Sequence, residues 1–387
     1  MKFLPEQKFF SIMALKTSRL NIDWLLVVAI IPLVLAGLMT MRPLSDNQDG
    51  TGFFIRQIIW IGLGFLIFFV FSAADWRFLR NSGVLFAFFA LAIITLIFLF
   101  IFGSNVRGSN SWFGFRFFSV EPSDPIKLLI ILVLSKYFSR RHVDIANFKH
   151  ILVSAFYAGA PALLVFFQPD LGSALVIFLI WFAMVSVSGI NKKHLFLVLA
   201  AVALAFAVSW FFVLRPYQKA RILTFLDPTR DPRGSGYNVL QSIIAVGSGQ
   251  FTGKGFGLGT QSRLNFLPEH RTDFIFAAFA EEWGFIGVVM IFFFFGILIW
   301  RILRNAFWGE GNFERLFVIG LAIFLMTHFF LHAGMNTGIL PVTGLNMPFL
   351  SYGGTNLITI FSGLGILMGM RKYSQRIYPG DTLIDLI

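Results

Sequence analysis

Residues 273–299 read DFIFAAFAEEWGFIGVVMIFFFFGILI, an apolar run long enough to cross a membrane as a helix. Asp273 would stand in the first turn of this helix, where a carboxylate can also serve as an ordinary cap. Helical spacing places Asp273, Ala277 and Glu281 on one face, with Glu281 about two turns deeper. A carboxylate inside a membrane helix is costly, so its presence favours a functional role. The run therefore predicts a membrane helix with a site at its mouth.

The composition of the whole chain is typical of a bundle of such helices. Of the 387 residues, 57% are hydrophobic and 13% are charged, and the mean hydropathy is +0.78. A soluble domain could not bury that much apolar surface, so we expect an all-α polytopic membrane protein. The net charge of +12 does not indicate nucleic-acid binding, because membrane proteins collect basic residues in cytoplasmic loops. The absence of cysteine excludes disulfides and cysteine-based metal or redox chemistry.

About ten stretches of the chain are long and apolar enough to span a bilayer. They lie near 22–41, 54–74, 82–102, 124–139, 150–167, 171–189, 194–214, 273–299, 314–335 and 352–370. Basic residues gather after the fourth, sixth, eighth and tenth stretches, so both termini are predicted to be cytoplasmic. No small-residue cleavage site follows the first stretch, which we expect to be retained. Because the chain has no linker, repeat or low-complexity tract, residues 1–387 are expected to form a single membrane domain.

The longest connection, residues 215–272, would lie on the extracytoplasmic side between helices seven and eight. Loops of this length are usually functional or disordered, and its glycine, aromatic and helical-period content argues against disorder. Its glycine-rich run, 247–259, contains Lys254, and glycines let backbone N–H groups approach an anion closely. The spacing is not that of a nucleotide-binding loop, so a lipid phosphate or pyrophosphate is the expected anion. The alternative is a plain hairpin loop.

Charged residues near the ends of other stretches each allow a plain and a functional interpretation. Arg56 could be an interfacial arginine whose charge reaches the lipid headgroups. Asp124 and Lys127 are three residues apart and can pair across one helical turn, which would lower their cost of insertion. Asp170 could cap the sixth helix. In each case the functional alternative is contact with a substrate.

The ninth stretch contains a histidine pair, and an uncharged segment follows it. His328 and His332 have a spacing that suits a metal, but no cysteine or acid accompanies them there, so we prefer packing or hydrogen bonding. Residues 335–356 are rich in glycine and proline. That composition is tolerated at membrane depth only where protein or a cavity surrounds the backbone. We expect a re-entrant loop against the site.

Several motifs together form a signature. They are PSDPIK (122–127), QPDLG (168–172), GTQS (259–262), FLPE (266–269), TDFIF (272–276), Glu281–Glu282, NTGILPVTG (336–344) and PFLSYGG (348–354). In these motifs, which extend over nearly the whole chain, the sequence resembles the SEDS family. The GTQS and FLPE motifs are closer to its elongation-type RodA branch than to the division-type FtsW.

The resemblance implies ten membrane helices in a multi-pass protein of the bacterial cytoplasmic (inner) membrane, with its active site on the extracytoplasmic side. It implies a peptidoglycan glycosyltransferase that polymerises lipid II, an undecaprenyl pyrophosphate-linked disaccharide peptide, during cell elongation. A class B penicillin-binding protein transpeptidase and the elongation machinery are the implied partners. The family's essential acid corresponds to Asp273, and its other important charged positions correspond to Arg56, Lys127 and Asp170.

The sequence departs from the family at two positions in these motifs. Asp124 stands where a glutamate is usual, which shortens the side chain by one methylene. Arg271 stands where a histidine is common, which puts in doubt any role of a histidine at that position.

The implied reaction converts an α-linked pyrophosphate donor into a β-1,4-linked product, which requires one inversion. Asp273 is predicted to be the general base for the attacking hydroxyl. Cationic side chains are expected to stabilise the departing polyprenyl pyrophosphate. A divalent cation, Mg²⁺ or Mn²⁺, could replace some of them, and no other cofactor is implied. The residues predicted to contact substrate are Arg56, Lys127, Asp170, Gln241, Lys254 and Glu269, with Arg221 as a further candidate.

Other function classes remain open from the sequence. A lipid II flippase would also need intramembrane charge and a groove for lipid tails, but no base, and its charges should cross the full membrane. A scaffold that only recruits a transpeptidase would need no polar site. The partner's helix is expected beside helices eight and nine, at Phe292–Phe295 and Phe329–Phe330, although plain contact with lipid would select the same residues.

Overall fold

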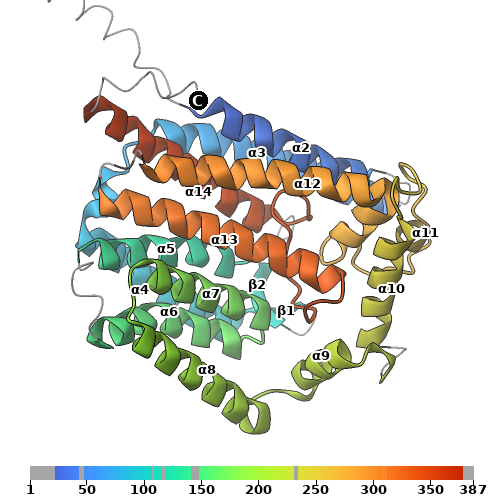
Figure 1. The fold of residues 1–387 in the computed structure, drawn as a ribbon, viewed down its shortest axis with the longest axis horizontal. Coiled ribbons are helices and arrows are strands. Elements are labelled where there is room, and N and C mark those ends of the chain that lie inside the picture. Colours follow the sequence, from blue (N-terminus) through green and yellow to red (C-terminus); the bar gives the residue numbers. More distant parts are fainter. Residues whose placement is uncertain are drawn as a thin grey trace, which may run out of the picture.

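The computed structural model describes residues 22–42, 48–106, 109–114, 119–140, 148–230, 234–307, 309 and 311–377. Ten of its helices coincide with the ten predicted stretches, which confirms the all-α polytopic fold (Figure 1). They are α2 (Trp24–Met41), α3 (Gln48–Ala73), α4 (Ser82–Phe102), α5 (Ser123–Ser139), α6 (Phe148–Phe167), α7 (Leu171–Val187), α8 (Lys192–Phe212), α12 (Ile275–Phe307), α13 (Asn312–Asn336) and α14 (Gly354–Ile377).

Seven of these helices in the described part of the chain are long and apolar enough to cross a membrane: α2, α3, α4, α6, α8, α12 and α13. The helices α5 and α7 have 17 residues each, slightly fewer than the roughly 20 that a bilayer needs. The predicted cytoplasmic position of both termini concerns residues 1–21 and 378–387, which lie outside the described residues.

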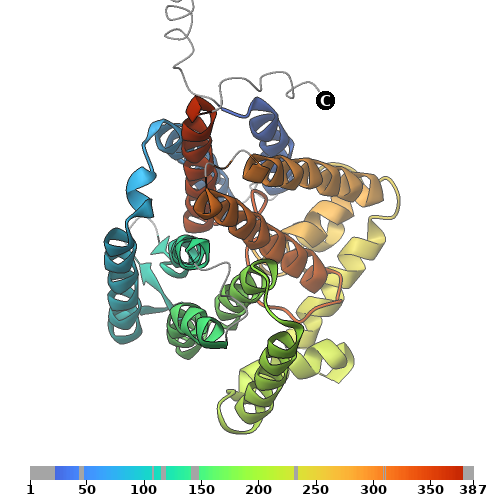
Figure 2. The same cartoon turned by 60° about the vertical axis from the view of Figure 1, so that its left-hand side comes forward.

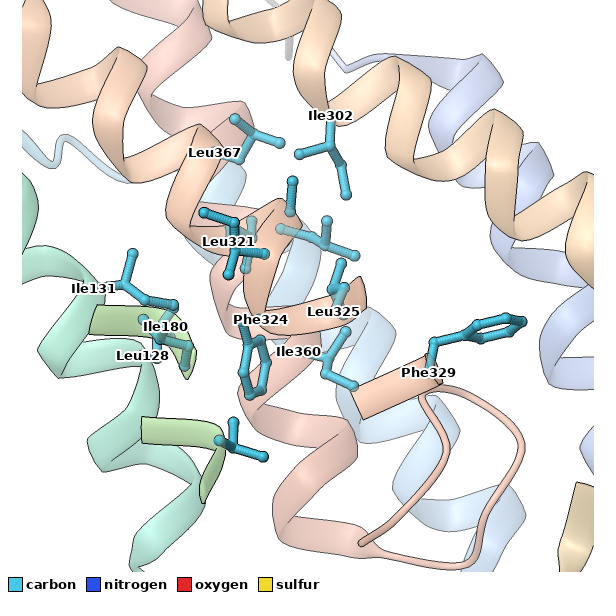
Figure 3. Packing of buried hydrophobic residues seen from close by; sticks show 14 of the residues in the cluster. Leu128, Ile131, Ile180, Ile302, Leu321, Phe324, Leu325, Phe329, Ile360 and Leu367 are labelled. Atoms are coloured by element: carbon cyan, nitrogen blue, oxygen red, sulfur yellow. The ribbon is translucent and has the colours of Figure 1, made fainter. Parts of the chain in front are cut away.

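The centre of the bundle is α13, which packs against α5, α7, α12 and α14. Figure 3 shows the packing around Leu321 and Phe324 of α13, which face Leu128 of α5, Ile180 of α7 and Ile360 of α14. Lipid is as apolar as these side chains, so close van der Waals packing rather than the hydrophobic effect holds such helices together. The helix α8 lies at the edge of the bundle (Figure 2). Its Val198 is buried, and most of its other side chains are exposed.

Ion pairs link the ends of several helices at one side of the bundle. Asp23, which caps α2, accepts from Arg301 of α12 at 2.8 Å, and its Oδ2 lies 3.2 Å from the guanidinium of Arg371 of α14. Arg80 of the short 3-10 helix η2 (Arg77–Arg80) pairs with Glu314 of α13 at 2.7 Å. The two acids are almost fully buried, whereas the Arg80 side chain is 35% exposed, and the pairs join helices that are distant in sequence.

The long connection before α12 is folded, as expected from its composition. It contains α9 (Pro216–Leu226), the 3-10 helix η3 (Pro228–Arg230), α10 (Ser235–Ser248) and the short α11 (Thr260–Arg263). Figure 1 shows α10 and α11 beyond one end of the bundle. A small antiparallel sheet, β1 (Ser104–Val106), β2 (Ser109–Gly114) and β3 (Ser119–Val120), joins α4 to α5 and was not predicted.

The glycine-rich run 247–259, in the long connection before α12, packs on that helix. The helix has a kink at Gly284, whose φ of 63° is open to glycine and strained for other residues. Gly253 (φ 80°) lies against the kink, so that a Cβ on either glycine would overlap the other segment's backbone. The backbone N–H groups of Lys254 and Gly255 donate to the carbonyls of Glu281 and Glu282 at 3.0 Å each, which fixes the loop there.

Candidate active site

A cavity of about 760 Å³ opens between the end of the bundle and the long connection. Its walls come from α3, α5, the N-terminus of α7, α9, the turn before α12, and the α13–α14 loop. Its charged lining residues are Arg56, Glu121, Asp124, Lys127, Asp170, Arg221 and Asp273.

Asp273 lies in the turn that leads into α12, and buried side chains hold its backbone. The amide of Asn336 donates to the Asp273 carbonyl at 2.9 Å and accepts from the N–H of Ala277 at 3.1 Å. The hydroxyl of Ser351 donates to the carbonyl of Thr272 at 2.9 Å. The α13–α14 loop also passes the carboxylate itself, because a Cβ on Gly344 would lie 3.6 Å from Oδ2 of Asp273. The position of Asp273 is therefore fixed by the end of α13 and by the α13–α14 loop.

Lys127 and Asp124 form a buried ion pair on the first turns of α5. Their Nζ and Oδ1 atoms are 2.8 Å apart, and the two side chains are 1% and 4% exposed. Asn356 of α14 lies 3.4 Å from the same carboxylate oxygen. The predicted pairing across one turn is confirmed. It lies in the cavity wall, so the pair can do more than lower a cost of insertion.

Glu121 is a lining residue that we did not predict. Its carboxylate accepts from the hydroxyl of Ser123 at 2.6 Å and from that of Ser173 at 3.4 Å. Burial raises the pKa of Glu121 to about 8, and the neighbouring carboxylates of Asp124 and Asp170 add to that rise. The signal in the sequence was weak: one acid directly before Pro122, at the start of a short charged helix.

Asp170 is both a helix cap and a lining residue. Its Oδ1 accepts from the backbone N–H of Ser173 at 3.0 Å, which confirms the predicted cap of the sixth membrane helix. The preceding carbonyl of Pro169 accepts from the hydroxyl of Tyr217 at 3.3 Å, which ties α9 to this edge of the cavity. Among the described residues, this cap uses Oδ1, so Oδ2 can face a ligand in the cavity.

Two arginines stand at more open parts of the cavity lining. Arg56 of α3 is exposed, and Arg221 of α9 lies 5.9 Å from the ring of Tyr217. Together with Lys127 they give the lining three permanent or near-permanent positive charges. Such a set suits an anionic ligand, since charge-assisted hydrogen bonds are strongest where water is excluded.

Comparison with known proteins identifies the family. Residues 18–376 match the cell cycle protein family FtsW/RodA/SpoVE. The chain belongs to this family. The peptidoglycan glycosyltransferase MrdB of Escherichia coli K12 is 34% identical over 331 residues, covering 86% of this chain and 88% of that protein. Stage V sporulation protein E of Bacillus subtilis is 33% identical over 366 residues, covering 93% of this chain and 99% of that protein.

Solved structures agree with this assignment. A peptidoglycan synthase complex studied for its coordination of polymerization and crosslinking contains a chain that is 29% identical, with a TM-score of 0.77. The match covers 92% of this chain and 98% of that one. The rod shape determining protein RodA of Thermus thermophilus is 28% identical, with a TM-score of 0.68 over 91% of this chain and 98% of that one. The resemblance to the SEDS family seen in the motifs is thereby confirmed.

For this member of the FtsW/RodA/SpoVE family, the structure gathers four of the predicted site residues at the cavity: Arg56, Lys127, Asp170 and Asp273, together with the candidate Arg221. Among the described residues, the cavity lining does not include Gln241, Lys254 or Glu269. Gln241 lies on α10, and Glu269 is an exposed residue whose carboxylate accepts from Thr272 at 3.1 Å.

Lys254 has a different partner from the one predicted. Its ammonium donates to Glu281 at 2.7 Å and to Thr260 at 2.7 Å. Glu281 also accepts from the backbone N–H of Gln261 at 3.0 Å, so this fully buried carboxylate organises the loop. The expectation that Glu281 lies below Asp273 on a shared face is wrong, because the helix begins only at Ile275 and Glu281 faces the loop.

The interpretation of the glycine-rich run as an anion cradle is also wrong for Gly249 and Gly253. A Cβ on Gly249 would overlap the carbonyl of Ala280, and one on Gly253 would overlap that of Glu282. These glycines allow close contact between the loop and α12 rather than between the loop and a ligand.

The histidine pair of α13 has partners other than a metal, as preferred. His328 lies on the cavity with Nδ1 3.1 Å from the carbonyl of Asn346, and His332 is buried beside Asn336. Within the described residues, no group of three or more histidine or acidic side chains is placed to hold a metal ion. We therefore derive no step through a divalent cation.

Proposed function

We propose that the protein is a peptidoglycan glycosyltransferase that polymerises lipid II into β-1,4-linked glycan strands. One observation carries the proposal: Asp273, held rigidly at the start of α12, shares a cavity with Arg56, Lys127 and Arg221. A carboxylate base and a set of cations are the two elements that transfer from a pyrophosphate donor needs. MrdB, a peptidoglycan glycosyltransferase of this family, supports the same chemistry.

In the proposed step the 4-hydroxyl oxygen of the acceptor sugar attacks the anomeric carbon of the donor. The bond from that carbon to the pyrophosphate oxygen breaks, which inverts the configuration. The carboxylate of Asp273 takes the hydroxyl proton, and polyprenyl pyrophosphate leaves with the bonding electron pair. Holding the base in place in advance removes the need to order it during the reaction.

The cations of the lining would hold the leaving group. Lys127 is the deepest of them, and its pairing with Asp124 fixes the position of its ammonium. Arg56 and Arg221, which are more accessible, can each donate two parallel hydrogen bonds to phosphate oxygens. We leave Gln241, Lys254 and Glu269 out of the proposed substrate contacts, because they lie elsewhere on the described structure.

We place the enzyme in the bacterial cytoplasmic membrane, with the cavity on the extracytoplasmic side. The clustering of cavity charges at one end of the bundle supports polymerisation rather than a lipid II flippase, which would need a charged path across the whole membrane. The role in cell elongation rests on the GTQS and FLPE motifs. Relatives of the MrdB and FtsW types are similarly identical to the chain, so complementation of rod shape or of division in depletion strains would decide between the two roles.

The decisive experiment is polymerisation of purified lipid II by the wild type and by Asp273→Asn, with and without a transpeptidase partner. The amide keeps the shape of the side chain but cannot take the proton, so glycan synthesis should fall by about 100-fold or more. Asp227→Asn is the matched control, because Asp227 is an exposed acid of the same connection whose carboxylate accepts, among the described residues, from Thr229. A wild-type rate in Asp273→Asn would remove the proposed base. Lipid II transport without polymerisation by the wild type would favour the flippase.

We also propose a class B penicillin-binding protein as partner, with its helix beside α12 and α13. Phe293 and Phe330 are 62% and 53% exposed there, whereas Phe295 and Phe329 are buried in a stacked pair and cannot reach a partner. Changing Phe293 and Phe330 to Trp should reduce co-purification, since added bulk blocks close helix contact. Phe196→Trp on the exposed face of α8 is the control and should change nothing. Unchanged co-purification would mean that this face only meets lipid.

A further inference from the structure

Glu121 occupies a point where three elements meet around the cavity. It follows β3 and precedes α5, and its N–H group lies 3.2 Å from the hydroxyl of Thr355 on α14. Its carboxylate is hydrogen-bonded to the hydroxyl groups of Ser123 of α5 and Ser173 of α7. Those two hydroxyl oxygens are themselves 3.3 Å apart. The carboxyl group thus has a fixed position inside the cavity wall, and the proposed transfer has no role for it yet.

The charges around Glu121 are out of balance. Among the described residues, its electrostatic neighbours are the carboxylates of Asp124 and Asp170 and the ammonium of Lys127. Lys127 is already paired with Asp124 at 2.8 Å. If all three acids were ionised, this buried corner would have two negative charges in excess beside the proposed site of an anionic pyrophosphate. Burying uncompensated charge is costly, and a bound proton removes part of that cost.

The surroundings of the three acids indicate which of them holds the proton. Asp124 is paired with the ammonium of Lys127, and Asp170 accepts from the backbone N–H of Ser173, so each has a partner that only donates. Glu121 is instead bonded to two hydroxyl groups, which can accept a hydrogen bond as readily as donate one. Its raised pKa of about 8 agrees with this choice. The remaining charged groups of the lining, Arg56, Arg221 and Asp273, complete the field that Glu121 experiences.

We propose that Glu121 is a substrate-binding residue. In its neutral, protonated form it allows the pyrophosphate of the lipid substrate to bind in the cavity. The proton lowers the negative charge beside the leaving group and offers a hydrogen-bond donor where a carboxylate would repel. Two acids of one cavity then have opposite states, with Asp273 ionised as the base and Glu121 neutral. The proposal rests on the proposed function and names a determinant of its substrate affinity.

The competing explanation is purely structural. Glu121 could serve only to join Ser123 and Ser173, and so to hold the N-termini of α5 and α7 together. In that case ionisation of Glu121 should change the stability of the fold but should not separately change substrate affinity. The two explanations therefore differ in the pH dependence of KM.

The experiment compares the wild type with Glu121→Gln, which copies the neutral acid in shape and in hydrogen-bond donation. Polymerisation of lipid II is measured from about pH 6 to about pH 9.5, with melting temperatures recorded at each pH. The pyrophosphate of lipid II is a diester and does not titrate in this range. Asp227→Asn is the control, because Asp227 is an exposed acid outside the cavity lining.

We expect KM of the wild type to rise about tenfold per pH unit above about pH 8, with kcat much less affected. Glu121→Gln should be within roughly threefold of the wild type at neutral pH and should lack this rise. Asp227→Asn should follow the wild type. The proposal is overturned if Glu121→Gln folds but loses activity at neutral pH, or if both proteins have the same profile.

A separate binding measurement distinguishes this inference from the proposed function. If the wild type makes no glycan at any pH, the proposed function fails. Equilibrium binding of labelled lipid II to the detergent-solubilised protein then tests Glu121 alone. Affinity should fall at alkaline pH in the wild type and stay constant in Glu121→Gln, and equal pH dependence in the two proteins would refute the proposal.

Discussion

Asn336→Ala should slow glycan synthesis much more than it weakens substrate binding. The Asn336 side chain is fully buried and makes hydrogen bonds at the entrance of α12. Its amide donates to the carbonyls of Asp273 and His332 at 2.9 Å each and accepts from the N–H of Ala277 at 3.1 Å. The substitution removes what holds the backbone of Asp273, and it leaves the charged lining of the cavity in place.

The expected magnitude follows from the groups that lose a partner. The Asp273 carbonyl and the Ala277 N–H each lose a hydrogen bond to a buried side chain, at about 1–3 kcal/mol for each. The free energy of unfolding should then fall by about 2–6 kcal/mol. If the turn relaxes so that Asp273 moves by about 1 Å, kcat should fall by about 100-fold, because transfer depends steeply on the position of the base. KM should change little.

The assay combines steady-state kinetics on lipid II with thermal unfolding in detergent. Ser242→Ala is the matched control: its hydroxyl donates to the Asn336 carbonyl at 2.8 Å, is equally buried, and does not contact Asp273. It should cost about 1 kcal/mol and leave kcat intact. Asn336→Asp keeps the size of the side chain, loses the donor to Asp273, and serves if the alanine variant does not fold. If kcat of a folded Asn336 variant stays within about threefold of the wild type, the residue does not position the base.

Three further outcomes test other parts of the structure. Lys127→Met and Asp124→Asn should each destabilise the protein by about 3–5 kcal/mol, because each leaves a buried charge unpaired. Their combination should restore the melting temperature, and restored polymerisation as well would exclude Lys127 as a pyrophosphate contact. Glu281→Gln should loosen the loop around α11, so trypsin should cleave at Arg263 faster than in the wild type. Lys254→Met should increase cleavage less, because the Lys254 side chain is 27% exposed. Equal cleavage rates in both variants and the wild type would contradict this prediction. In the folded protein the pKa of Glu121 is raised from 4.5 to about 8, so the folded state keeps this proton to a higher pH than the unfolded state does. The free energy of unfolding should therefore fall as the pH rises from 4.5 to about 8. Melting temperatures should fall over this range in the wild type and should lack this fall in Glu121→Gln.

The membrane helices could be predicted because each needs a long apolar run, and such runs are visible without knowledge of the fold. The kink of α12 could not, because a glycine such as Gly284 inside an apolar run is compatible with a straight helix. The sheet β1–β3 was missed because its strands have two to six residues, too short for a periodic pattern.

The site was predictable to the extent that family motifs or helix starts placed its residues. Lys127 and Asp170 stand on the first turns of α5 and α7, whose ends meet at the cavity. Lys254 was assigned because it lies in the glycine-rich run, but the direction of a loop side chain depends on the path of the loop. Glu121 had no periodic or motif signal, and its role became visible only when Ser123 and Ser173 were seen together around it.

The contact between Gly253 and Gly284 has a consequence for how such folds change in evolution. Both backbones have positive φ, and a Cβ on either residue would overlap the opposite segment. Each partner is already the smallest residue, so a larger residue on one side cannot be compensated by a smaller one on the other. Paired changes across relatives, which reveal many contacts, cannot reveal this one. A relative that lacks either glycine must therefore route the loop differently over its eighth membrane helix.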